Sequence, residues 1–251
     1  MSKEPTQKSL GFRAYERLRH EVLTCKLAPG ERLNINELCQ ALGFNLSAVR
    51  EALSRLTSEG LVQADPKRGF NVAPISVAEL RDLTSVRIEI ENLCLRRSMV
   101  LGNVAWEASV HAAFHIMSNT PQTEADNTLQ ATSDWWSVHA AYHHSLCSAC
   151  DSPWLLRLRG QLFVQSERYR MLMGRFGLRD RRDVNREHQD ITDAVLARDV
   201  DRATGLMASH FNMTSQMLLD ASASDVRGSH LGQGIFIVDA KISSGAGRLN
   251  G

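Results

Sequence analysis

The chain has few cysteines, an almost balanced charge and no long hydrophobic run. Nowhere do about 18 uncharged apolar residues follow one another, and the first twenty residues contain no apolar stretch that could act as a signal peptide. Its five cysteines are too few and too scattered for a disulfide framework. These absences argue against a membrane-spanning or secreted protein, and we expect a cytoplasmic one.

Cys147 and Cys150 form a CxxC pair without a second pair elsewhere. A zinc site would need further ligands, and a thioredoxin-like redox site would need a preceding strand. We therefore interpret both cysteines as small apolar residues near the end of a helix.

The composition is that of a globular protein, with 43% hydrophobic and 23% charged residues in a chain of 251. This length suits one large domain or two ordinary ones. Residues 1–75 hold 11 Lys and Arg against 8 Asp and Glu, although the whole chain has a net charge of only +1. Such an asymmetry permits a nucleic-acid-binding face in the first part of the chain without requiring one.

The first 75 residues have the pattern of a winged helix-turn-helix. A helical pattern ending near Leu23 is followed by a second one over residues 34–42, which stops at Gly43. A third helix begins with Ser47 as its N-cap and ends at Gly60. Residues 61–75 then alternate like two short strands around the turn at residues 65–69, which predicts a two-stranded wing.

This ordered set resembles the GntR family of bacterial transcription regulators. The stretch VREALSRLTSEGLV, from Val49 to Val62, and the basic wing tip before Gly69 carry the resemblance. It implies that the third helix enters the major groove of DNA and that the wing reaches the neighbouring minor groove.

We expect the outward side chains of this region to contact DNA. Arg50 can bind guanine or clamp a phosphate, and the alternative is a solvated arginine paired with Glu51 or another acid. Lys67 and Arg68 can reach the minor groove, or they can simply form a solvated turn. The complete set of expected DNA-binding residues is Asn36, Asn45, Ser47, Arg50, Ser54, Lys67, Arg68 and Gly69.

Two positions depart from the family pattern. Leu46 stands where many members carry an arginine, and Asn36 stands where some relatives have a phosphate-contacting arginine. The loss of two cations should weaken nonspecific attraction to DNA and reduce its salt dependence.

Residues 76–221 show six helical patterns without intervening strands. The first opens with Ser76 and Glu79 in capping-box spacing and carries an apolar stripe that includes Val86 and Leu93. The pattern predicts an all-α six-helix bundle, so the whole fold should be mainly α. It resembles the FCD effector domain of one GntR branch. We expect residues 1–10 to form a flexible N-terminus, residues 11–75 the DNA-binding domain, residues 76–221 the effector domain and residues 222–251 a disordered, glycine-rich tail.

Four histidines lie on the inward stripes of three bundle helices. His139 and His143 are one turn apart on one helix, and His188 and His210 lie on the last two. One such histidine is usually a hydrogen-bonded core residue. Four of them indicate a divalent metal site, because burying unpaired imidazoles is costly and a metal accepts a lone pair from each.

The FCD resemblance implies the same site, with His139 replacing the aspartate that the family usually has. An all-imidazole set favours Zn²⁺ or Ni²⁺ over Mn²⁺ or Mg²⁺ and leaves the site more positive toward an anion. The HAAYH spacing lacks the glutamate of HExxH, so no general base is built into it.

We therefore predict that a small carboxylate binds at the metal. Arg87 and, on the helix containing SERYR, Gln165, Arg168 and Tyr169 are the candidate effector-binding residues, although both arginines can also be solvated. A similarity to glutarate-responsive repressors makes a dicarboxylate the preferred effector.

The sequence leads us to expect a homodimeric repressor that an effector releases from palindromic operator DNA. The alternatives are a direct Zn²⁺- or Ni²⁺-responsive regulator and a metal-dependent enzyme fused to a DNA-binding domain.

Overall fold

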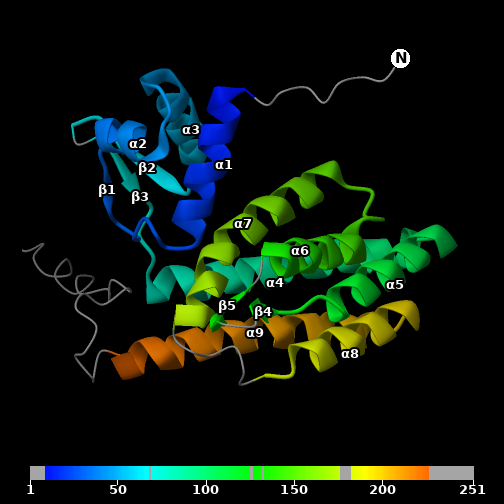
Figure 1. The fold of residues 1–251 in the computed structure, drawn as a ribbon. Coiled ribbons are helices and arrows are strands. Elements are labelled where there is room, and N and C mark those ends of the chain that lie inside the picture. The colour runs from blue at the N-terminus through cyan, green and yellow to red at the C-terminus, as the bar shows by residue number, and fades with distance from the viewer. Residues whose placement is uncertain (1–8, 68, 125–126, 132, 176–181, 226–251) are drawn as a thin grey trace, which may run out of the picture. The chain divides into compact units, whose positions relative to one another are not determined.

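The computed structural model describes residues 9–67, 69–124, 127–131, 133–175 and 182–225 (Figure 1). These residues form two compact units, with the boundary between Ala78 and Glu79. Arg68, most of the predicted tail and most of the expected flexible N-terminus lie outside the described residues. Residues 222–225, which were predicted to belong to the disordered tail, instead form the end of the last helix, Val200–Asp225.

The first unit is a winged helix-turn-helix. It contains helices α1 (Leu10–Leu23), α2 (Ile35–Leu42) and α3 (Leu46–Ser58), and strands β1 (Arg32–Leu33), β2 (Val62–Asp65) and β3 (Gly69–Val72). The wing was predicted to have two strands, but the sheet has three, in the antiparallel order β1-β3-β2. A two-residue strand is too short to show the alternation on which the sequence prediction relied.

Helix α3 packs along α1, and apolar residues on both helices are fully buried. The expected N-cap at Ser47 is wrong. Asn45 caps α3 instead, because its side-chain oxygen accepts a hydrogen bond from the backbone N–H of Ala48 at 2.9 Å. Gly43 ends α2 with a φ of 68°, as its sequence position predicted.

The second unit contains the six predicted helices. They are α4 (Val77–Leu101), α5 (Val104–Ser118), α6 (Ser133–Cys147), α7 (Pro153–Arg175), α8 (Val184–Leu196) and α9 (Val200–Asp225). Between α5 and α6 the structure adds a short antiparallel hairpin that the sequence pattern did not indicate, formed by β4 (Thr123–Glu124) and β5 (Asn127–Ala131).

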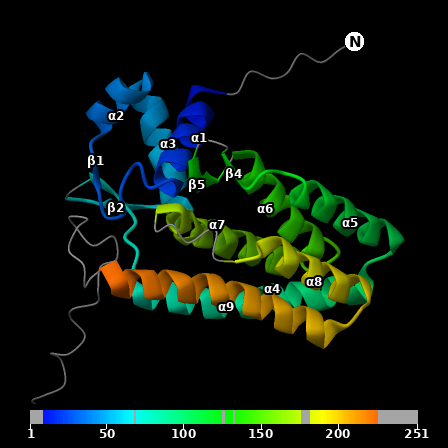
Figure 2. The ribbon, with the colours of Figure 1, turned by 60° about the horizontal axis from the view of Figure 1, so that its bottom comes forward.

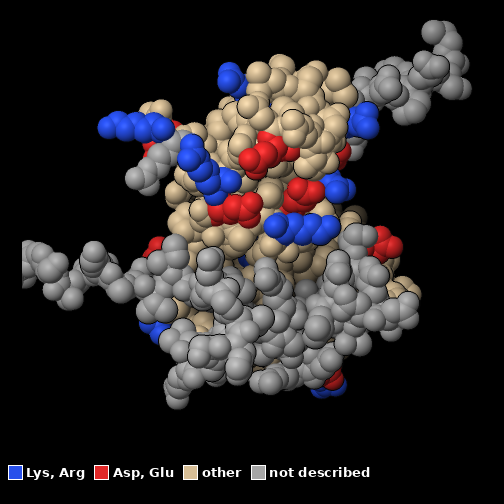
Figure 3. All heavy atoms as spheres, turned by 60° about the vertical axis from the view of Figure 1, so that its left-hand side comes forward, with Lys and Arg blue, Asp and Glu red and all other residues tan. Residues whose placement is uncertain are grey.

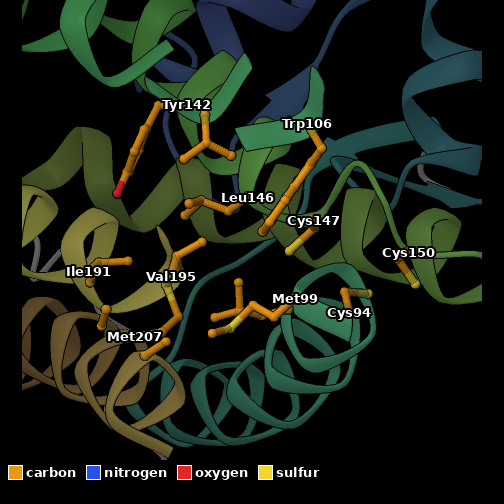
Figure 4. Packing of buried hydrophobic residues seen from close by; sticks show 14 of the residues in the cluster. Cys94, Met99, Trp106, Tyr142, Leu146, Cys147, Cys150, Ile191, Val195 and Met207 are labelled. Atoms are coloured by element: carbon orange, nitrogen blue, oxygen red, sulfur yellow. The ribbon is translucent and has the colours of Figure 1, made fainter. Parts of the chain in front are cut away.

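The core of this unit lies among α4, α5, α6, α8 and α9 (Figure 4). Helices α4 and α9 run side by side (Figures 1 and 2), joined by hydrogen bonds from Arg96 to Asp201 and Thr204, each 3.1 Å long. Cys94, Cys147 and Cys150 are buried in this core as free thiols, which agrees with the interpretation of the CxxC pair as apolar residues.

The buried face of α4 departs from the predicted apolar stripe, although Leu80 of that stripe is buried. Val86, Leu93 and Val100 are exposed, whereas Arg87 and Glu91 are buried. The sequence pattern was misleading here because α4 turns two charged side chains toward the interior, where each has a partner. The exposed apolar residues therefore require another explanation.

Candidate functional site

The expected DNA-reading surface of the first unit is built around α3. Ser47, Arg50 and Ser54 are all exposed on this helix. Arg50 makes no ion pair or hydrogen bond within the described part of the chain. The carboxylate of Glu51, its suggested partner, instead lies against Gly11 of α1. The structure thus leaves the Arg50 guanidinium available to a ligand.

The other expected DNA contacts differ in what holds them. Asn45 is occupied as the cap of α3, and the exposed Asn36 donates its backbone N–H to Asn34 at 3.0 Å. The backbone N–H of Lys67 donates to Asp65 at 2.8 Å, which shapes the wing tip, and Gly69 has a φ of 85° that suits glycine. On the face seen in Figure 3, Lys and Arg side chains are interspersed with Asp and Glu side chains.

The four predicted histidines come together in the second unit. His139, His143, His188 and His210 are all buried, and one ligand atom from each lies within 4.8 Å of the others. Ring centroids are 4.6 Å apart for His139 and His143 and 4.7 Å apart for His188 and His210. Three helices therefore place four imidazoles around one point.

Tyr142 positions two of these helices. Its hydroxyl donates to the backbone oxygen of His188 at 3.0 Å, which joins α6 to α8 directly beside the cluster. His139 also stacks on Trp135, with centroids 4.6 Å apart. The cluster is consequently framed by aromatic rings on the α6 side.

Burial lowers the pKa of all four histidines, and the shift is large for His139, His143 and His188. The neighbouring imidazoles and Arg170 add to it for His139, whereas Glu187 opposes it for His210. Neutral imidazoles retain a lone pair, which metal binding requires.

The residues present fit a divalent cation. Neither ring nitrogen of His143 or His188 makes a well-aligned hydrogen bond to any residue that the structure describes. Buried polar atoms normally have a partner, and a metal bound by imidazole nitrogens would supply one here.

A pocket adjoins the cluster through His210. Its polar lining residues include Arg87, Ser166, Tyr169 and Arg170, and its apolar lining includes Leu80, Leu83 and Leu218. Arg87 is buried, donates to Ser166 at 2.6 Å and lies over the ring of Phe211 at 3.9 Å. Its Nε and Nη2 have no hydrogen-bond partner among the described residues. Burial is also the main cause that lowers the pKa of Arg87 to about 10.

The candidate effector residues on α7 are separated by the structure. Tyr169 lines the pocket and its hydroxyl donates to Glu79. Arg168 and Gln165 contact each other at 3.4 Å and are not part of that lining. Arg170, which was not among the predicted site residues, faces the pocket and contacts His139.

Arg182 and Glu187, which flank His210, were also not predicted, because nothing in a helical pattern distinguishes them.

Comparisons with known proteins agree with this architecture. The model for the gntR family of bacterial regulatory proteins matches residues 10–72, and the FCD domain model matches residues 82–213. The chain belongs to the GntR family. The expected FCD branch is confirmed, and the family consists of transcription regulators rather than enzymes.

This GntR-family protein is 36% identical over 203 residues to the uncharacterized HTH-type transcriptional regulator BphR of Paraburkholderia xenovorans, covering 81% of this chain and 82% of that one. It is 32% identical over 199 residues to the HTH-type transcriptional repressor GlaR of Escherichia coli K12, covering 78% and 90%. The solved structure of E. coli McbR/YncC matches 85% of this chain and 99% of its own, with a TM-score of 0.68 at 19% identity. That likeness supports the fold.

No helix within the described ranges is both long enough and apolar enough to cross a bilayer.

Proposed function

We propose that this GntR-family protein is a repressor whose hold on operator DNA is released by a small carboxylate bound at a metal centre. The observation that carries the proposal is the convergence of four buried imidazoles beside a pocket in which Arg87 has unused donors. Neither feature stabilises the fold without a ligand, and together they offer a cation and an anion site in one place.

The four histidines His139, His143, His188 and His210 would hold the metal. An all-imidazole set without a carboxylate suits Zn²⁺ or Ni²⁺. The bound cation would supply a positive Lewis-acid site for a carboxylate oxygen.

The lining of the pocket supports a dicarboxylate as the preferred effector. One carboxylate would lie toward the histidines. The other would accept hydrogen bonds from Nε and Nη2 of Arg87, which have no partner among the described residues. Leucines in the lining would contact the methylene chain between the two carboxylates. The resemblance to glutarate-responsive repressors points to the same class of ligand.

Operator binding would require two copies of the chain. Val86, Leu93 and Val100 are 40%, 49% and 75% exposed, and their spacing of seven residues places them on one face of α4. Two copies of this face, related by a two-fold axis, would bury the apolar residues against each other. Such a homodimer would present two α3 helices to the half-sites of a palindrome.

The effector would act by favouring one arrangement of the dimer. To change operator occupancy from 99% to 1%, it must prefer the released state by about 5.5 kcal/mol. The main test measures the affinity for operator DNA by fluorescence anisotropy, with Zn²⁺ alone and with Zn²⁺ plus glutarate or succinate. Release by glutarate only when Zn²⁺ is present supports the proposal.

A direct metal sensor is the second candidate, because an all-imidazole site matches Zn²⁺ and Ni²⁺ without help from an organic ligand. In that case Zn²⁺ or Ni²⁺ alone changes operator affinity. If neither the metal nor any carboxylate changes it, both candidates fail.

A further inference from the structure

The first residue of helix α3 is an exposed leucine. Leu46 is 46% exposed, and side chains four positions apart lie on one face of a helix. Leu46, Arg50 and Ser54 therefore form one outward row, and all three are exposed. The side chains that α3 buries belong to the opposite face and are those of Ala48, Val49, Ala52, Leu53 and Leu56. Leu46 is accordingly not part of the core of the winged helix-turn-helix.

The cap of α3 holds this leucine in a fixed direction. The side chain of Asn45 accepts a hydrogen bond from the N–H of Ala48 at 2.9 Å, and its backbone oxygen accepts one from the N–H of Val49 at 3.1 Å. Both bonds close around Leu46, so its backbone is fixed in the first helical turn before any ligand binds. Its apolar surface leaves water only when a partner covers it.

The neighbours of Leu46 indicate what that partner is. In a helix-turn-helix, the N-terminal residues of the recognition helix contact base edges in the major groove. Arg50, in the same row, has no ion pair or hydrogen bond within the described part of the chain and can read guanine. A leucine has no donor or acceptor, so it can bind neither a phosphate nor a polar base edge. The one apolar group that the bases present in this groove is the 5-methyl group of thymine.

We propose that Leu46 selects thymine at one position of each operator half-site by packing on the 5-methyl group. This inference rests on the proposed binding of operator DNA and is independent of the metal centre and the effector. Cβ atoms four residues apart on a helix are about 5–6 Å apart, and successive bases on one strand are about 3.4 Å apart. The thymine therefore lies within about two base pairs of the one that Arg50 contacts.

The chemistry of leucine also predicts which property of DNA binding stays the same. Leu46 carries no charge and displaces no counterion from the phosphates, so Leu46→Ala should leave the salt dependence of operator binding unchanged. Fluorescence anisotropy at several salt concentrations measures this. A weaker salt dependence in Leu46→Ala would assign the residue to the DNA backbone and contradict the inference.

The main test uses the wild type and modified DNA, so it does not depend on the folding of a variant. Operator sequences are first selected by the wild type from a random-sequence duplex library. Each thymine of the selected half-site is then replaced by deoxyuridine, which lacks only the 5-methyl group. At one thymine in each half-site, this change should weaken binding about fourfold, as expected for one buried methyl group, and about fifteenfold when both half-sites are changed.

Variants assign that loss to Leu46. Leu46→Ala should bind the thymine and deoxyuridine operators equally well, because the side chain that packs on the methyl group is gone. Leu46→Arg should select a G·C pair at this position in place of T·A, since arginine donates to O6 and N7 of guanine. Leu10→Ala is the control, because Leu10 is the first residue of α1 and 52% exposed, and this variant should behave as the wild type does.

Four results would overturn the inference while leaving operator binding intact. They are a selected half-site without thymine, deoxyuridine changes that each cost the wild type less than about twofold, a deoxyuridine effect that is undiminished in Leu46→Ala, and continued selection of T·A by Leu46→Arg. A wild type that selects no sequence would refute the proposed operator binding and this inference with it. A methyl-dependent operator that neither Zn²⁺ nor glutarate affects would support the inference and count only against the proposed effector mechanism.

Discussion

Oε2 of Glu187 on α8 lies 2.8 Å from Nδ1 of His210 on α9. Burial by itself raises the pKa of Glu187, but hydrogen bonds with His210 and Arg182 outweigh it and lower the pKa to about 2. The group is therefore a carboxylate at neutral pH and can only accept. It fixes the proton of His210 on Nδ1 and decides which nitrogen a cation can use.

Replacing Glu187 with glutamine should weaken Zn²⁺ binding about 10- to 100-fold, because an amide can turn its NH₂ group toward Nδ1 and no longer fixes the tautomer. Competition with a chromophoric chelator measures the change. Asp190→Asn, on the same helix, alters a carboxylate paired with the exposed Arg186 and should leave the affinity unchanged. Equal affinities in all three proteins would mean that packing alone orients His210.

Replacing Arg87 should change stability and ligand binding in opposite directions. Its buried Nε and Nη2 have no hydrogen-bond partner in the part of the chain that the structure describes, so the buried charge is costly until an anion binds. Arg87→Met should raise the free energy of unfolding of the ligand-free protein by about 1 kcal/mol, since a packed apolar side chain replaces a poorly satisfied charge. The variant should lose the increase in melting temperature that glutarate gives the metal-loaded wild type. Arg157→Met, at an exposed position, serves as the control, and a destabilised ligand-free Arg87→Met protein would contradict the prediction.

The buried ion pair of Glu91 and Arg159 is connected to the histidine cluster through the backbone of His143. Nε of Arg159 donates to Glu91 at 2.9 Å, and its Nη2 donates to the backbone oxygen of His143 at 2.6 Å. Glu91→Leu should lower the free energy of unfolding by about 3–5 kcal/mol, because it leaves a buried guanidinium without its counter-ion. Urea denaturation followed by circular dichroism measures this.

Two comparisons test the origin of that loss. The double variant Glu91→Leu, Arg159→Met should recover most of the stability, because no buried charge remains. Asp151→Asn, in the exposed pair with Arg97, should cost less than about 1 kcal/mol. A double variant as unstable as the single one would show that the loss is due to packing.

Local signals were enough to predict the winged helix and the inward histidines. Gly43 marks the end of α2, and helical spacing fixes which residues share a face with His188. These inferences depend only on the period of the helix. No long-range information is needed to make them.

The residues that the sequence analysis missed depend on how the helices rotate against one another. Arg168 and Arg170 are two positions apart on α7 and point in nearly opposite directions, so only one can face the histidines. The pattern of SERYR does not say which. Likewise, the apolar spacing of Val86 and Leu93 suggested a core face, because the sequence cannot show that Arg87 and Glu91 find buried partners on α7.

Leu93 tests the proposed dimer face of α4. Leu93→Glu would place two like charges close together across the two-fold axis and should convert a dimer into a monomer in sedimentation experiments at micromolar concentration. Ile116→Glu alters a similarly exposed apolar residue on α5 and should leave the dimer intact. A dimeric Leu93→Glu protein would place the interface elsewhere.

Arg50 tests the expected DNA-reading surface without disturbing the proposed metal centre. Its guanidinium is exposed on α3 and has no partner within the described residues, so its removal should cost no folding energy. Arg50→Ala should abolish specific protection of the operator in footprinting, since one bidentate contact to guanine contributes about 1–3 kcal/mol per half-site and a dimer loses two. Arg17→Ala, at an exposed position on α1, removes the same charge from the same unit and corrects for nonspecific attraction. Zn²⁺ content should match the wild type in both variants, and normal protection by Arg50→Ala would remove this residue from the DNA contacts.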